Sequence, residues 1–157
     1  MEPNIAHISR FLVSGLTVRT KNQDEFRQES AKIPGLWGQF FSASVADQIP
    51  ERLPNAPVVG VYSTYESDAN GLYNVTAGVP VTATSADFDS IEIQEGKYLV
   101  FEARGPMPAA VIQAWGDIWN YFEQHPQVQR RYATDFESYG GPDEVRIHIG
   151  VDRKSVV

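Results

Sequence analysis

Glu137 is the residue of this chain whose type and setting best suit binding chemistry. It lies between Arg130 and Val151, where the strong turn signal at residues 140–143 and the alternation of apolar and polar residues predict a β-hairpin. In an extended strand the side chains of Glu137 and Tyr139 point to one face and those of their neighbours to the other. An acid and an aromatic ring that project together suit a cationic, partly apolar guest.

A carboxylate in an apolar cleft loses its hydration, so a donor or a cation keeps it ionised, or else its pKa rises. A bound cation would supply the missing charge, and aromatic rings would add stacking and cation–π contacts of roughly 0.5 to 2 kcal/mol each. The aromatic candidates are Trp37, Tyr62, Tyr65, Trp115, Trp119 and Tyr139. An exposed place at a sheet edge would explain Glu137 without any ligand.

Several of these candidates also have a purely structural interpretation. Trp115 and Trp119 share the apolar face of an amphipathic helix, which favours a place in the core. Tyr62 and Tyr65 fall on opposite faces of one strand, so at most one should face the cleft. His148 alternates with two isoleucines, and it lines the cleft only if the polar-looking face of the sheet is the cleft side.

Other chemistries are disfavoured by what the chain contains. It has no Cys and three scattered His, which predicts no metal site, and we expect no cofactor because no phosphate-binding glycine loop occurs. The net charge of -7 argues against direct nucleic-acid binding. With no signal-like start and no run of about 18 apolar residues, we expect a cytoplasmic protein without a membrane span. Its 157 residues, 42% of them hydrophobic, predict one domain over 1–157.

The elements that must position the candidate residues occur twice, in the order β-α-β-β. The first set is a bent strand or a hairpin-like entry over 4–20, broken near Ser14-Gly15, followed by a helix over 36–49 and a hairpin over 58–84. The second set is a strand over 88–105, a helix over 107–125 and the hairpin over 130–151. The helices align with Trp37 on Trp119, and the hairpins with Tyr62 on Phe136. We therefore predict two repeats, about 4–84 and 89–152, with a cleft between them.

The segments YLVFEARGPMPAAVIQAWGDIW and DFESY…EVRIHIGV, together with the duplication, resemble the GyrI-like small-molecule-binding domain, also called the bacterial transcription-activator effector-binding domain. The resemblance implies an α+β fold of duplicated βαββ units with pseudo-two-fold symmetry, a curved antiparallel sheet, two main helices and a central ligand cleft. In that family the domain follows a helix-turn-helix region, as in AraC-type and multidrug-responsive MerR-type regulators, or stands alone. We expect the stand-alone form.

The same resemblance implies a function. Family pockets hold a Glu in the strand before the last and accept amphipathic cations, and Glu137 and Tyr139 match that acid and its partner two residues on. We expect a sensor or sequestering protein for such cations. The alternatives are a hydrolase of strained electrophilic rings that uses Glu137 and Tyr139, or a modulator that docks on a topoisomerase or transcription regulator. A protein partner or a homodimer belongs to these expectations.

Overall fold

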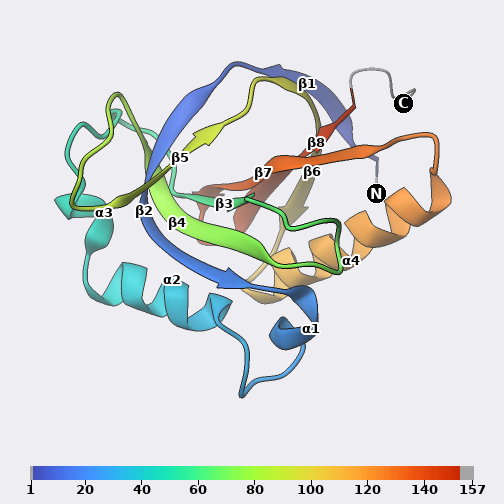
Figure 1. The fold of residues 1–157 in the computed structure, drawn as a ribbon, viewed down its shortest axis with the longest axis horizontal. Coiled ribbons are helices and arrows are strands. Elements are labelled where there is room, and N and C mark those ends of the chain that lie inside the picture. The colour runs from blue at the N-terminus through green and yellow to red at the C-terminus, as the bar shows by residue number, and fades with distance from the viewer. Residues whose placement is uncertain (1, 153–157) are drawn as a thin grey trace.

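The protein folds around one curved sheet in a computed structural model that describes residues 2–152 (Figure 1). Its elements are β1 (Asn4–Ile8), β2 (Phe11–Thr20), α1 (Asn22–Glu25), α2 (Ile33–Ser42), α3 (Val45–Gln48), β3 (Val59–Ser63), β4 (Tyr73–Val81), β5 (Asp89–Ile93), β6 (Gly96–Arg104), α4 (Ala109–Gln124), β7 (Arg130–Gly141) and β8 (Glu144–Val151). The predicted α+β class and both predicted hairpins are confirmed. Residues 1 and 153–157 of the predicted domain lie outside the described residues.

The strand order shows the predicted two-fold arrangement. All neighbours are antiparallel, in the order β1-β6-β8-β7-β3-β4-β2-β5, so β3 and β7 meet at the centre of the sheet. Outward from that centre, β4, β2 and β5 on one side match β8, β6 and β1 on the other. The first strand of each half therefore pairs with the other half: β1 with β6, and β5 with β2.

The long first strand expected in each half is wrong, because each segment is two strands with different partners. Residues 4–20 form β1 and β2, and the chain breaks between Ile8 and Phe11, not at Ser14-Gly15. Gly15 instead lies inside β2 opposite Gly78, where a Cβ would fall 1.9 Å from a backbone oxygen of β4. The missing side chain allows close strand contact there. Residues 88–105 likewise form β5 and β6.

The helix predicted over 36–49 is wrong at both ends. It begins three residues earlier, at Ile33, because Pro34 lies in the first turn, where a helix needs no amide hydrogen. It ends at Ser42, and Ser44 then takes a left-handed conformation with φ of 52° before the short helix α3. The second predicted helix is confirmed as α4.

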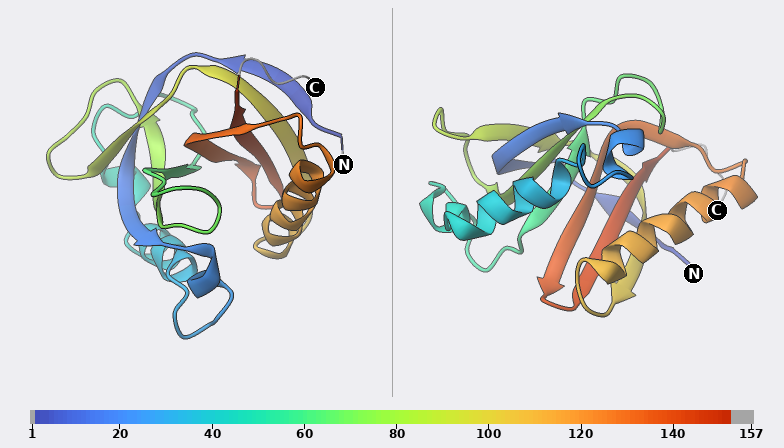
Figure 2. Two further views of the ribbon diagram at one scale, coloured as in Figure 1. Left: turned by 45° about the vertical axis from the view of Figure 1, so that its right-hand side comes forward. Right: turned by 90° about the horizontal axis from the view of Figure 1, so that it is seen from below.

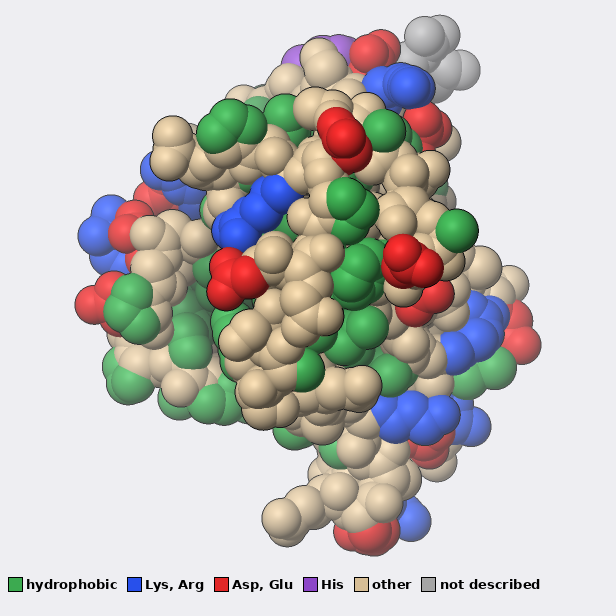
Figure 3. Space-filling view, turned by 90° about the vertical axis from the view of Figure 1, so that its left-hand side faces the viewer, with side chains coloured by type: hydrophobic (Ala, Val, Ile, Leu, Met, Phe, Trp, Pro, Cys, Tyr) green, Lys and Arg blue, Asp and Glu red, His purple; other side chains and the backbone are tan. Residues whose placement is uncertain are grey.

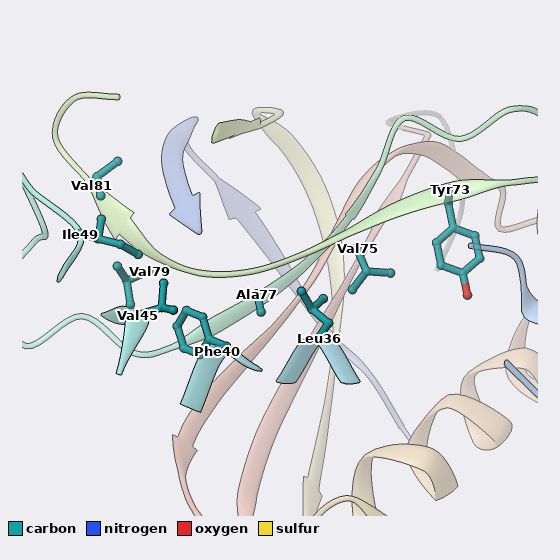
Figure 4. Packing of buried hydrophobic residues seen from close by; sticks show 9 residues of the cluster. All are labelled: Leu36, Phe40, Val45, Ile49, Tyr73, Val75, Ala77, Val79 and Val81. Carbon is teal, nitrogen blue, oxygen red and sulfur yellow. The ribbon is translucent and has the colours of Figure 1, made fainter. Parts of the chain in front are cut away.

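Both long helices lie on the same side of the sheet (Figure 2), where α2 packs against β2 and β4 and α4 packs against β6 and β8. Leu36 and Phe40 of α2 bury their side chains against β4, beside Val45 and Ile49 (Figure 4). Ile118 of α4 is buried against strands β6 and β8 in the same way. Each fully buried side chain of this size contributes roughly 1.5 to 3 kcal/mol. The central strands β3 and β7 form the floor between the two helices.

The surface carries charges of both signs. On the face shown in Figure 3, Lys and Arg side chains are interspersed with Asp and Glu, and apolar side chains gather toward its middle. Within residues 2–152, no helix combines the length and apolarity needed to cross a bilayer.

Candidate functional site

Glu137 lies at the centre of the sheet, opposite Gly60 in the register that joins β3 to β7. Glu137 is 2% exposed, so its carboxylate is almost completely removed from water. Gly60 makes room for it: a Cβ there would fall 2.9 Å from Glu137 Oε1 and 2.9 Å from Trp37 Cζ2. The carboxylate and the Trp37 ring therefore both pack over a position that has no side chain.

Three neutral donors hold the Glu137 carboxylate. The Tyr62 hydroxyl and the Trp115 indole Nε1–H each donate to Oε2 at 2.7 Å, and the Tyr139 hydroxyl donates to Oε1 at 2.9 Å. Burial raises the pKa of Glu137, and the three hydrogen bonds only partly oppose this rise. Among residues 2–152, Glu137 makes no ion pair.

The two tyrosines are fixed as donors by the same surroundings. Burial raises the pKa of the Tyr62 and Tyr139 hydroxyls, and the charge of Glu137 raises both further. Each hydroxyl therefore keeps its proton at neutral pH and donates a hydrogen bond to the carboxylate.

A cavity of about 780 Å³, here called the main cavity, opens over Glu137 between α2 and α4. Its walls are Glu25, Ile33, Pro34, Trp37, Phe41, Val58, Tyr62, Met107, Pro108, Val111, Ile112, Trp115, Glu137, Tyr139, Gly141 and Pro142. The lining is apolar and aromatic apart from the carboxylates and hydroxyls, and its size suits a drug-sized organic molecule. The Trp37 ring closes one side by meeting the Tyr139 ring edge-on, with centroids 5.5 Å apart.

A smaller cavity of about 170 Å³, here called the side cavity, adjoins the main one. The two share the lining residues Glu25, Ile33, Tyr62, Ile112 and Trp115. Beside it lies a second buried acid, Asp135, which forms an ion pair with Arg130 at 2.7 Å. The Tyr65 hydroxyl and the Gly150 amide also donate to Asp135, at 2.5 and 2.8 Å.

The structure brings most of the predicted site residues together. Trp37, Tyr62, Trp115, Glu137 and Tyr139 line the main cavity, while Tyr65 and Trp119 line the side cavity.

Tyr62 lines the main cavity and Tyr65 does not. The expectation that the two tyrosines lie on one strand is wrong, because β3 ends at Ser63. Thr64, with φ of 52°, then turns the chain, so that Tyr65 also lines the side cavity. Trp119 does not lie in the core as its helical spacing favoured: it is 37% exposed and meets Phe26 edge-on at 6.1 Å.

His148 is not among the residues that line either cavity. Its ring stacks on Phe136 with centroids 4.1 Å apart, on the face of the sheet opposite Glu137. Burial lowers the pKa of His148 to about 4, so the ring is neutral at pH 7. Within the described chain its place is structural packing.

Sequence reasoning missed Glu25, Gly60, Arg130 and Asp135. A signal existed for Asp135, because it precedes Glu137 by two residues and so shares its face of the strand. Gly60 and Glu25 carried no such local signal, since their roles depend on contacts with distant segments.

The fold and the cavity define an effector-binding domain of the GyrI-like type, as the resemblance implied. Residues 4–151 match the family model described as Cass2, integron-associated effector binding protein, and the chain belongs to that family.

Individual proteins agree with this assignment. The chain is 36% identical to the integron cassette protein VCH_CASS2 from the mobile metagenome of Vibrio cholerae, over 96% of each chain, with a TM-score of 0.82. It is 29% identical to YobU of Bacillus subtilis (strain 168), named as a candidate transcriptional regulator, over 87% of this chain and 85% of YobU. The structure of SAV2435 bound to tetraphenylphosphonium shares the fold at 22% identity, with a TM-score of 0.79 over 97% of this chain and 94% of that one.

Proposed function

We propose that this protein binds an amphipathic organic cation in the main cavity, with Glu137 as the counter-charge, and acts as a sensor or a sequestering protein for such molecules. Glu137 carries the proposal, because it is a buried carboxylate held only by neutral donors at the base of a large aromatic cavity. An organic cation would restore the charge balance that burial removes.

The shape and lining of the cavity support the same class of guest. The rings of Trp37, Tyr62 and Trp115 offer faces and edges to a flat or branched apolar body, and cation–π attraction would add roughly 0.5 to 2 kcal/mol per ring. SAV2435, which shares the fold, binds tetraphenylphosphonium, a cation with an apolar aromatic surface. Membership of an effector-binding family and the similarity to YobU support a regulatory role.

The test is Glu137→Gln, which keeps the shape of the side chain and removes its charge. We would titrate the wild type and the variant calorimetrically with a naphthylmethyl trimethylammonium ion and with its neutral isostere, in which carbon replaces nitrogen. We expect the variant to lose roughly 1.5 to 3 kcal/mol of binding free energy for the cation and almost none for the isostere.

Glu102→Gln is the matched control, because it removes the same charge from an exposed side chain that does not line the cavity. It should leave both affinities unchanged. Equal losses for cation and isostere in Glu137→Gln, or no loss for either, would contradict the proposal.

A further inference from the structure

The main cavity is lined by two carboxylates, Glu137 at its floor and Glu25 at its edge. No Lys, Arg or His stands among the described residues that line it. A guest with one positive charge would neutralise Glu137 and leave the second negative charge facing the cavity. The lining therefore has more negative charge than a monocation can balance.

Three hydrogen bonds hold the Glu25 carboxylate in place. It ends α1, and its Oε2 accepts the Thr20 hydroxyl at 2.5 Å and the Lys32 amide at 2.9 Å. Its Oε1 accepts the Ile33 amide at 3.1 Å. The carboxylate is thus fixed between the end of β2 and the first turn of α2, so a guest would not have to order it.

These donors position Glu25 but do not neutralise it. They are a hydroxyl and two backbone amides, and among residues 2–152 Glu25 forms no ion pair. The start of α2 supplies a partial charge of only about half an elementary charge. Each carboxylate oxygen can accept two hydrogen bonds, so Oε1 retains capacity for a cationic donor.

An aromatic wall connects the two carboxylates. Tyr62 and Trp115 both donate to Glu137 and also line the side cavity together with Glu25. Beside them, burial raises the pKa of the Tyr73 hydroxyl, and the charges of Glu25 and then Glu137 raise it further. The Tyr73 hydroxyl is therefore close enough to both carboxylates for each charge to affect its pKa.

We propose that the preferred guest is a dication, with two positive ends joined by an apolar aromatic spacer, one end on Glu137 and the other on Glu25. This inference rests on the proposed function and narrows its ligand class.

A series of synthetic probes of increasing length tests the preference for a dication on the wild-type protein. Each probe is a diphenylalkane with a trimethylammonium group at both ends, paired with an isostere in which one of these groups is replaced by tert-butyl, and the alkane length varies along the series. We expect one spacer length at which the dication binds about tenfold more tightly than its monocationic isostere. No preference for the dication at any length would overturn the proposal.

Glu25→Gln shows whether Glu25 supplies that preference. At the preferred length the variant should lose the roughly tenfold advantage of the dication, so that the dication and the monocation bind about equally tightly. Glu29→Gln, an exposed acid in the same segment, is the matched control and should keep the advantage. Equal weakening of both probes in Glu25→Gln would show that Glu25 only holds the start of α2, and this would overturn the proposal.

The outcomes separate this inference from the proposed function. If the wild type binds the monocation and the dication equally, the proposed cation site stands and the dication inference fails. If the wild type binds neither probe at any length, both fail.

Discussion

Two acids on one strand, Asp135 and Glu137, show how the same chemical group serves the fold in one place and a guest in another. They are two residues apart on the same face of β7 and are 0% and 2% exposed. Asp135 has the Arg130 guanidinium at 2.7 Å and two further donors. Glu137 has three donors as well, but all are neutral.

The difference lies in where the compensating cation comes from. A buried ion pair is satisfied within the fold, and breaking it leaves an uncompensated charge. Neutral donors offset only part of the cost of removing a carboxylate from water. Burial therefore raises the pKa of Glu137. Asp135 thus belongs to the architecture, while Glu137 keeps a need for positive charge that a guest can meet.

The largest expected effect comes from removing the internal cation. Arg130→Ala would leave Asp135 buried without its partner, and we expect a loss of about 3 to 5 kcal/mol in the free energy of unfolding, measured in urea. Arg146→Ala is the control, because its pair with Glu102 is exposed and should be worth about 1 kcal/mol or less. If both variants lost a similarly small free energy of unfolding, the buried pair of Arg130 and Asp135 would stabilise the fold no more than the exposed pair does.

His148 is a half-buried titratable group on the other face of the sheet. Its pKa falls to about 4 in the folded protein, from about 6.5 when unfolded, so the fold favours the neutral ring. This contribution is fully present above pH 6.5 and is lost as the pH falls toward 4, by about 3 kcal/mol in total.

His148→Phe tests that pH dependence, since it keeps the stacking on Phe136 and removes the titration. The wild type should lose more stability than the variant between pH 7 and pH 4.5, as judged by urea midpoints. Parallel losses in the two proteins would contradict the assignment.

A smaller and sharper contrast comes from removing one phenol hydroxyl beside each acid. Tyr65→Phe and Tyr139→Phe each delete a hydrogen bond to a carboxylate, and each should lower the free energy of unfolding by about 1 to 2 kcal/mol. A saturating aromatic cation compensates the charge of Glu137, so it should reduce the difference in free energy of unfolding between the wild type and Tyr139→Phe. The same difference for Tyr65→Phe should stay unchanged. Denaturant titrations with and without the cation measure both. If the cation reduced this difference equally in the two variants, it would contradict the idea that Glu137 needs a cation and Asp135 does not.

Much of the fold could be predicted from local pattern. The turn at 140–143 and the alternation on either side of it gave the last hairpin, and with it the shared face of Glu137 and Tyr139. Helical spacing predicted α4 to within two residues at its start and one residue at its end. Such features depend on residues close in sequence, which is why the pattern alone contains them.

The remaining features depend on contacts between distant segments. The split of residues 4–20 follows from β1 pairing with β6 of the other half, which no local pattern specifies. The end of α2 follows from a left-handed Ser44, an unusual conformation for that residue. The alignment of Trp37 with Trp119 is confirmed, since the two residues lie in the matching helices α2 and α4. It could not indicate that the tryptophan that donates to Glu137 is Trp115, because that contact joins α4 to β7.

The proposed cation site requires Glu137 to be a carboxylate that lacks a cation, and carbon-13 NMR of its side-chain carboxyl tests this directly. Without ligand, the pKa of Glu137 should lie above its ordinary value, because the buried carboxyl favours its protonated form. A saturating aromatic cation should lower that pKa by about one to two pH units, the equivalent of 1.5 to 3 kcal/mol of attraction. The same titration midpoint of Glu137 with and without the bound cation would contradict its role as the counter-charge.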